Sequence, residues 1–277
     1  MPEQSPYEEE RDLEERIDEE LLLLLAAAFL KAQQSISPTS FTRNDFQGMQ
    51  EVFRNAASKI IPELQSVSRE AVEVAFQRLP ISTLSVDDID FSDPRFRQLV
   101  TNIFEDNIGY LMDTNEQMFN RLQEIAQARG WSEEQLARYL KKFYGIVPNH
   151  VTTVLSMEDA LKAEKVSNKT INERVQKRVD DLVEWRVQLS SALVGTEVVE
   201  GSKDLTYTIL GETGQLDSEQ YIKQWFAVVD SRTTQVCLNS HLTTAEIGGF
   251  FPNGFAHPPA LNPLHPCRSS MRIVRRF

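Results

Sequence analysis

The sequence predicts a mainly α-helical protein with a small α+β module at its C-terminal end. Glycine is scarce, with 11 residues among 277, so few breakers interrupt the long segments of mixed polar and apolar residues. Apolar residues recur at helical spacing up to about residue 194, and after Gly195 glycines are interspersed with β-branched and aromatic residues. We therefore predict an elongated helical domain over residues 13–195 and an α+β module over residues 196–277, preceded by a mobile acidic segment over residues 1–12.

Two helical regions are predicted in the first third of the chain. The first covers Leu13–Gln34 and contains a segment, residues 21–30, that is apolar nearly all round. A helix of this kind needs burial on several sides, in a core or against a partner. The second covers Asn44–Leu79, where Pro62 is expected to kink or divide it. A loop over residues 80–92 follows.

Further helices are predicted before the C-terminal module. The helix over residues 93–130 opens with a capping aspartate that is followed by proline, a residue favoured at the first helical position. A short helix over residues 132–145 opens with the capping-box spacing of Ser132 and Gln135. The last helix, continuous or in two parts, spans about residues 157–194.

Within the module, residues 221–229 have the composition of a strand. A helix is the competing interpretation, because Asp217 and Ser218 are suitable capping residues. From Asp230 onward the chain consists of turns, prolines and potential metal ligands. The module is therefore expected to be small and to combine strand with irregular structure.

The charge of the chain is negative and unevenly distributed. A formal net charge of −12 argues against a protein that binds nucleic acid over its whole surface, because phosphate contacts need lysine and arginine. Residues 1–20 are strongly acidic, whereas the last ten residues contain four arginines and no acid: Arg268, Arg272, Arg275 and Arg276. Such ends are typical of interaction segments, and solvated charge explains them equally well.

No feature of the sequence indicates secretion or a membrane. The N-terminus is acidic where a secretory signal is basic, and two cysteines do not make a disulfide framework. The apolar segment over residues 21–30 is about half the length that a membrane-spanning helix needs. We therefore expect a soluble protein that is made inside the cell and has no membrane partner.

Potential metal ligands gather in a window of 31 residues. Cys237, His241, His265 and Cys267 lie there, with His257 as a fifth. The three-residue gap between Cys237 and His241 fits a zinc ligand pair, whereas the one-residue gap between His265 and Cys267 is tighter than standard zinc-finger spacing. Thiolate and imidazole suit Zn²⁺ in a reducing cytoplasm, and four protein ligands imply a closed, structural site. We predict structural zinc on these four residues, with His257 as a possible substitute.

Three other interpretations of this window remain open. Cys237 and Cys267 could form a disulfide, or they could be buried thiols among histidines and prolines that pack for stability alone. A catalytic zinc, as in a metal-dependent hydrolase, would use three ligands and a water, and would need a general base nearby. Glu246 is the only carboxylate between residues 237 and 267, and the chain lacks His-Glu-x-x-His, P-loop and Gly-x-Ser-x-Gly motifs. We therefore expect that the chain is not an enzyme.

The order of residues in the module resembles the phage head-morphogenesis family, the Mu F-like minor capsid proteins. The family pattern is a tryptophan, Asp-x-Arg-Thr, a cysteine or histidine, a turn, Pro-Pro, His-Pro, one residue, and then Cys-Arg-Ser or Cys-Arg-Cys. The chain departs from it by lacking the residue between Pro266 and Cys267 and a second cysteine after Arg268. The resemblance covers about 50 of the 277 residues, and the matching residues are Trp225, Asp230, Arg232, Thr233, Cys237, Pro258, Pro259, His265, Pro266, Cys267, Arg268 and Ser269.

The resemblance implies a virion protein that is present in few copies inside the capsid at the portal vertex. Its expected partners are the portal protein and other capsid or scaffold proteins, and it would be in the host cytoplasm during assembly. The implied role is in head assembly, genome packaging or genome delivery. The basic segment Arg268–Phe277 could then touch packaged DNA, although four arginines contribute only weak non-specific binding.

Overall fold

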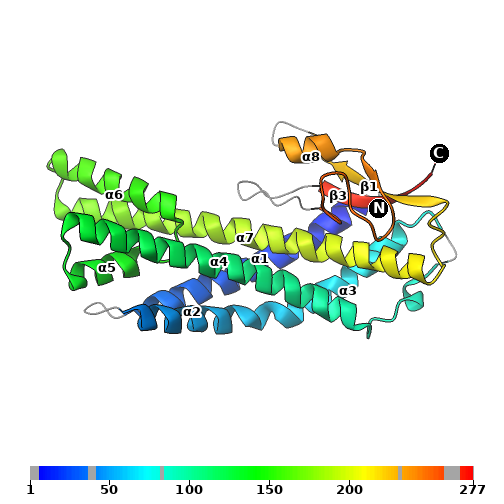
Figure 1. Ribbon diagram of the computed structural model, residues 1–277, viewed down its shortest axis with the longest axis horizontal. Coiled ribbons are helices and arrows are strands. Elements are labelled where there is room, and N and C mark those ends of the chain that lie inside the picture. Colours follow the sequence, from blue (N-terminus) through cyan, green and yellow to red (C-terminus); the bar gives the residue numbers. More distant parts are fainter. Residues whose placement is uncertain (1–5, 37–41, 82–83, 230–232, 259–268, 277) are drawn as a thin grey trace, which may run out of the picture. The chain divides into compact units, whose positions relative to one another are not determined.

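The computed structural model describes residues 6–36, 42–81, 84–229, 233–258 and 269–276 (Figure 1). The chain divides into two compact units. Unit 1 comprises Met1–Leu21, Ile60–Phe104 and Leu189–Phe277, and unit 2 comprises Leu22–Lys59 and Glu105–Gln188.

The predicted fold class is confirmed, because the chain is mainly helical and carries a small antiparallel sheet near its C-terminal end. No helix of the described residues is long and apolar enough to cross a membrane. The elements are α1 (Pro6–Gln34), α2 (Arg43–Ala57), the 3-10 helix η1 (Ser58–Ile60), α3 (Ile61–Gln77), the 3-10 helix η2 (Val86–Asp88), α4 (Pro94–Arg129), α5 (Glu133–Phe143), α6 (Pro148–Ala163), α7 (Asn168–Glu212), β1 (Tyr221–Ala227), α8 (Gln235–Ser240), β2 (Thr244–Ala245) and β3 (Ser269–Arg275).

Several predicted helix boundaries are confirmed, and local chemistry explains them. Pro62 lies in the first turn of α3, where its missing N–H is not needed, so it divides the second helical region. The Ser132 hydroxyl accepts a hydrogen bond from the backbone N–H of Gln135, and the side-chain oxygen of Gln135 accepts one from the backbone N–H of Ser132. α1 differs from expectation at its start, because it begins at Pro6, ahead of the predicted Leu13.

Helix α7 was expected to end near residue 194, but it continues to Glu212. Gly201 lies within the helix at a position where another part of the protein packs closely. A Cβ at this position would lie 3.2 Å from Cδ1 of Leu99, so the absence of a side chain allows the contact. Thr206 is β-branched, yet its hydroxyl donates to the carbonyl oxygen four residues earlier at 2.7 Å. The glycines and β-branched residues that predicted an end to the helix are therefore packing and hydrogen-bonding positions within it.

Unit 1 contains the sheet, in which β1 lies between β2 and β3 and pairs antiparallel with both. Alternate residues of β1 are buried, and Trp225 at its centre is fully covered. The Trp225 ring meets the Phe251 ring edge-on, with centroids 5.3 Å apart. One apolar core joins β1 and β3 to helices α3 and α7, through residues that include Val72, Phe76, Tyr207, Leu210, Trp225, Cys237, Phe251 and Met271.

Unit 2 has a helical core that encloses a buried arginine. Arg186 of α7 is 4% exposed and donates to Asn115 Oδ1, to the Gly145 carbonyl and to the Leu111 carbonyl, at 2.8, 2.8 and 2.9 Å. Its guanidinium also lies 5.6 Å from the centre of the Phe29 ring. Burial lowers the pKa of Arg186, since water no longer stabilises the charged form.

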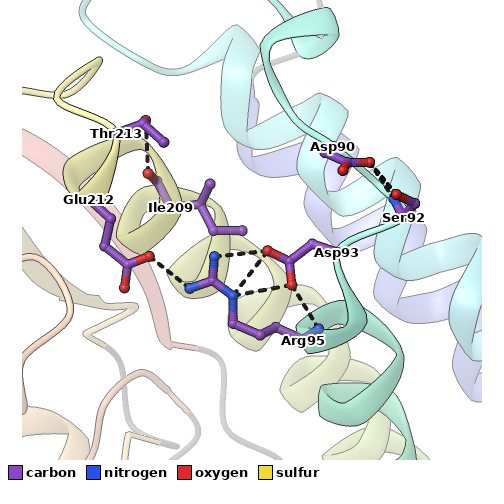
Figure 2. Close-up of polar contacts among 7 residues, drawn as sticks. All are labelled: Asp90, Ser92, Asp93, Arg95, Ile209, Glu212 and Thr213. Carbon is purple, nitrogen blue, oxygen red and sulfur yellow. Dashed lines mark hydrogen bonds and ion pairs between the residues drawn. The ribbon is translucent and has the colours of Figure 1, made fainter.

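An ion-pair cluster in unit 1 fixes the start of α4 (Figure 2). Asp93 is the N-cap of α4, and its carboxylate accepts from the backbone N–H of Arg95 at 2.9 Å. Figure 2 shows the Arg95 guanidinium between two carboxylates, those of Asp93 and of Glu212 at the end of α7, each at 2.8 Å. The cluster therefore combines a helix cap with a tie between α4 and α7.

Replacing Asp93 with alanine is expected to lower the free energy of unfolding by about 1 kcal/mol, because the cap is lost. The hydrogen bonds from Arg95 hold the pKa of Asp93 below its ordinary value. Its contribution is therefore fully present above the unfolded-state pKa near ~4 and is lost as pH falls through the folded-state pKa. Urea titrations at neutral and acidic pH measure both effects, and Asp93→Asn, which keeps a cap acceptor without charge, separates them.

A control lies in the same loop. Within the described part of the chain, the Asp90 carboxylate accepts local bonds from the backbone and hydroxyl of Ser92, at 2.8 and 2.6 Å (Figure 2). Asp90→Ala should therefore destabilise the protein less than Asp93→Ala does. Equal losses from the two variants would contradict the role assigned to the α4 cap.

Candidate functional site

The structure describes only part of the predicted zinc set. Cys237 lies in α8, and His241 immediately follows that helix. His265 and Cys267 lie outside the described residues, as do Asp230 and Arg232 of the family pattern. Across the described ranges, no group of three or more histidine, cysteine, aspartate and glutamate side chains is arranged to hold a metal ion.

Cys237 is positioned by a helix cap and by the core of unit 1. The Thr234 hydroxyl accepts from the backbone N–H of Cys237 at 3.3 Å, which starts α8 at the turn after β1. The Cys237 side chain is 5% exposed and belongs to the core that contains Trp225. Cysteine is well suited to such a site as a small apolar residue.

His241 is held by the end of β1. Its Nδ1 atom accepts from the backbone N–H of Ala227 at 3.1 Å, and its ring lies 5.4 Å from the Phe226 ring. A neutral imidazole that accepts at Nδ1 carries its proton on Nε2. In this geometry Nδ1 accepts the Ala227 hydrogen bond and Nε2 carries the proton, so neither nitrogen has a lone pair available for a metal. His241 would therefore bind a metal only after its bond to Ala227 had broken.

His257 faces helix α7. Its Nδ1 atom lies 2.6 Å from the carbonyl oxygen of Pro258, and Nε2 lies against Gly201 of α7, where an added Cβ would be 3.3 Å away. Burial is the main cause that lowers the pKa of His257, and the lysines Lys223 and Lys203 add to the effect while Asp204 opposes it. His257 is therefore directed at α7 and not at α8.

Glu246 is the carboxylate that a hydrolytic mechanism would need as a base. It forms an ion pair with Arg276 at the protein surface, and its side chain is 64% exposed. The described residues therefore give the hydrolase interpretation no specific support.

The sequence did not reveal a buried charge cluster beneath the sheet, formed by Glu200, Lys203 and Asp204 of α7 with Lys223 of β1 and Ser270 of β3. Lys223 is fully buried, and its Nζ atom donates to Asp204 Oδ1 at 2.7 Å and to the carbonyl oxygens of Gly249 and Ala256 at 2.8 Å each. Three acceptors satisfy all three protons of the ammonium group. Lys223 therefore fixes the loop between β2 and β3 to α7.

The second half of this cluster attaches β3 to α7. Glu200 and Lys203 are both 0% exposed; Lys203 Nζ donates to Glu200 Oε1 at 2.7 Å and to Ser270 Oγ at 2.9 Å. The other carboxylate oxygen of Glu200 accepts from the backbone N–H of Met271 at 2.8 Å. A buried ion pair with these additional hydrogen bonds has its charges compensated, and it specifies one register of β3 against the helix.

Burial and pairing act in opposite directions on Asp204. Burial raises the pKa of Asp204 more than the nearby Lys223 lowers it. A signal for the cluster was present in the sequence, because Lys223 stands two residues before Trp225 and so shares its face of the strand. The arrangement is chemically suited to positioning the strands and loop, since its charged groups are directed at one another.

The comparisons with known proteins assign no family. No protein-family model, no curated protein and no solved structure matches the chain. The function of the C-terminal module is therefore inferred from its own residues and geometry.

Proposed function

We propose that the chain is a minor capsid protein of a phage, which acts in head morphogenesis inside the capsid at the portal vertex. The observation that carries this proposal is the order of residues in the C-terminal module. That order runs from Trp225 through Cys237 and Pro258 to the His265-Pro266-Cys267-Arg268-Ser269 segment.

The packing of the described pattern residues supports a structural role for the pattern. Trp225, Cys237 and Pro258 are all buried, the first two of them in the core of unit 1. A pattern made of buried core residues maintains the shape of a module and does not itself carry out chemistry. A module that is built around a buried core is suited to presenting a surface to other proteins.

The proposed partners are the portal protein and other capsid or scaffold proteins, with the host cytoplasm as the place of assembly. Contact with packaged DNA through the C-terminal arginines would be weak. Arg272 donates to Gln224 and lies 4.7 Å from the Phe226 ring, and Arg276 pairs with Glu246. Arg275 is exposed and is the better-placed candidate among the described arginines.

Procapsids test the proposal directly. The chain is expected to co-sediment with procapsids that contain portal protein, and to be lost from procapsids assembled without it. Quantitative mass spectrometry of both preparations, and of mature virions, measures its copy number relative to portal. Finding the chain only outside virions and assembly intermediates would contradict the proposal.

We also propose that Cys237, His241, His265 and Cys267 hold a structural zinc ion, which requires His241 to release its hydrogen bond with the Ala227 backbone. His257 would be a substitute ligand only after it turns away from α7. The natural protein, purified without chelators, should contain about one zinc per chain, and Cys267→Ser should lose it together with thermal stability. His150→Asn is the matched control, since His150 is the one histidine outside the cluster. Zinc-free natural protein would exclude the proposal and leave Cys237 as a packing residue.

A further inference from the structure

One face of helix α1 is apolar and exposed. Leu21 and Leu25 are buried in the protein, but Leu23 is 71% exposed and Leu30 is 54% exposed. Residues 26 and 27, both alanines, are also exposed and lie between these two leucines on the same face. The segment that the sequence marked as apolar all round therefore has one side in the core and one side uncovered.

A groove in unit 2 adjoins this exposed face. It runs between α1 and α7 with a volume of about 380 Å³, and its wall includes Leu23, Phe29 and Leu30 of α1 with Val183 of α7. Contiguous exposed apolar surface of this kind marks a protein interaction site. A groove between two helices can receive side chains of a third helix.

Charges at the two ends of the face have opposite sign. Glu19 and Glu20 are exposed and lie one turn ahead of Leu23 in the same helix. At the other end, Gln33 donates to the backbone carbonyl of Lys141 at 2.8 Å, and both line a basic pocket together with Arg138. The exposed face of α1 thus runs from acidic residues, through apolar ones, to a pocket with a net basic lining, and the α7 wall of the groove also carries Asp180 and Glu184.

We propose that the partner of this face is a second copy of the chain, docked through antiparallel packing of the two α1 helices. With the two-fold axis between Ala26 and Ala27, Leu23 of each copy lies opposite Leu30 of the other. The small alanines at the crossing point allow the two helices to approach closely. Leu23 and Leu30 of each copy then pack into the groove of the other copy.

Antiparallel packing also matches the charges. Glu19 and Glu20 of one copy lie opposite Gln33 and Gln34 of the other, beside the pocket lined by Arg138 and Lys141. Two-fold symmetry repeats each contact, so one pattern of acidic, apolar and basic residues complements itself. This inference is independent of the proposed phage function.

Sedimentation velocity of the full chain over a range of concentrations tests the apolar contact. The natural chain should form a dimer, and Leu23→Glu or Leu30→Glu should raise its dissociation constant by about 100-fold. Both leucines are exposed, so neither variant disturbs the core. Leu238→Glu is the matched control, since Leu238 of α8 is 44% exposed and lies outside the proposed interface.

A charge exchange tests the partner and its orientation. The double variants Glu19→Lys/Glu20→Lys and Arg138→Glu/Lys141→Glu should each weaken the dimer by about tenfold, because symmetry counts every lost pair twice. The variant that combines all four changes should recover most of the affinity. Added salt should also raise the dissociation constant of the natural dimer, because it screens the charge pairs.

Each other outcome overturns the proposal. A chain that stays monomeric at all concentrations shows that another molecule, or none, covers the face. A dimer that Leu23→Glu leaves intact uses a different surface. Failure of the combined charge variant to recover affinity excludes antiparallel pairing of two α1 helices.

Discussion

Replacing Glu200 with alanine is expected to lower the free energy of unfolding by about 3–5 kcal/mol. The change leaves the Lys203 ammonium fully buried without its carboxylate, and it removes the acceptor of the Met271 backbone N–H. Removing one partner of a buried pair is far more costly than removing both, because an uncompensated charge remains in a medium of low dielectric constant.

Urea denaturation followed by tryptophan fluorescence measures this loss. The double variant Glu200→Leu/Lys203→Met should recover much of the stability, since apolar residues of similar volume often replace a buried pair at little cost. Glu124→Ala is the control: it breaks the exposed pair with Arg121, and a change within about 0.5 kcal/mol is expected. A loss below about 1 kcal/mol for Glu200→Ala would show that water reaches the cluster.

Replacing Arg186 with alanine is the second change with a large expected effect, a loss of about 3–5 kcal/mol. The variant leaves three buried acceptors, Asn115 Oδ1 and the carbonyls of Gly145 and Leu111, without the guanidinium that joins them. It also leaves a cavity beside Phe29, which adds to the cost.

Arg186→Lys should recover little of this stability, because a single ammonium group does not reproduce the planar fork of donors that serves acceptors on three segments. Arg178→Ala is the matched control, since Arg178 is exposed on the same helix two turns earlier. Thermal denaturation of the four proteins measures the order of stability. A lysine variant as stable as the natural protein would show that charge, and not geometry, is what unit 2 requires.

Local chemistry made many elements predictable from the sequence. The Asp93 cap, the Ser132 capping box and Pro62 act on residues within one turn, and the structure places helix boundaries at each of them. The strand over residues 221–229 was also predicted, and β1 confirms it at Tyr221–Ala227. Such signals depend on neighbours in sequence and are therefore readable without the fold.

The remaining features depend on contacts between distant residues. The continuation of α7 past residue 194 needs Leu99 to pack against Gly201, and the buried charge cluster needs Ser270 to meet Lys203. Tertiary packing overrides helix propensity in the first case and the usual exposure of lysine in the second. Alternation along β1 places Lys223 on the buried face with Trp225, but the partners of Lys203 and the packing of Gly201 are not visible in a local pattern.

The candidate zinc site also combines a local signal, which the sequence reveals, with a contact between distant residues, which it does not. The spacing of Cys237 and His241 is a local signal, and it indicated a ligand pair, whereas the short helix α8 that carries Cys237 was not predicted. The bond from the Ala227 backbone to His241 depends on where β1 ends relative to α8, so it could not be predicted. Sequence thus identified the chemical types of the candidate ligands but not the tautomer of the histidine.

The order in which the ribosome releases these segments gives the buried charge cluster a further consequence. Glu200, Lys203 and Asp204 are synthesised first, Lys223 follows, and Ser270 and Met271 come last. Until β3 emerges, the Glu200–Lys203 pair lacks the two groups that complete its hydrogen bonds. The sheet therefore closes over α7 only at the end of this stretch, and a chain stalled before β3 exposes an unfinished, charged surface to chaperones and proteases.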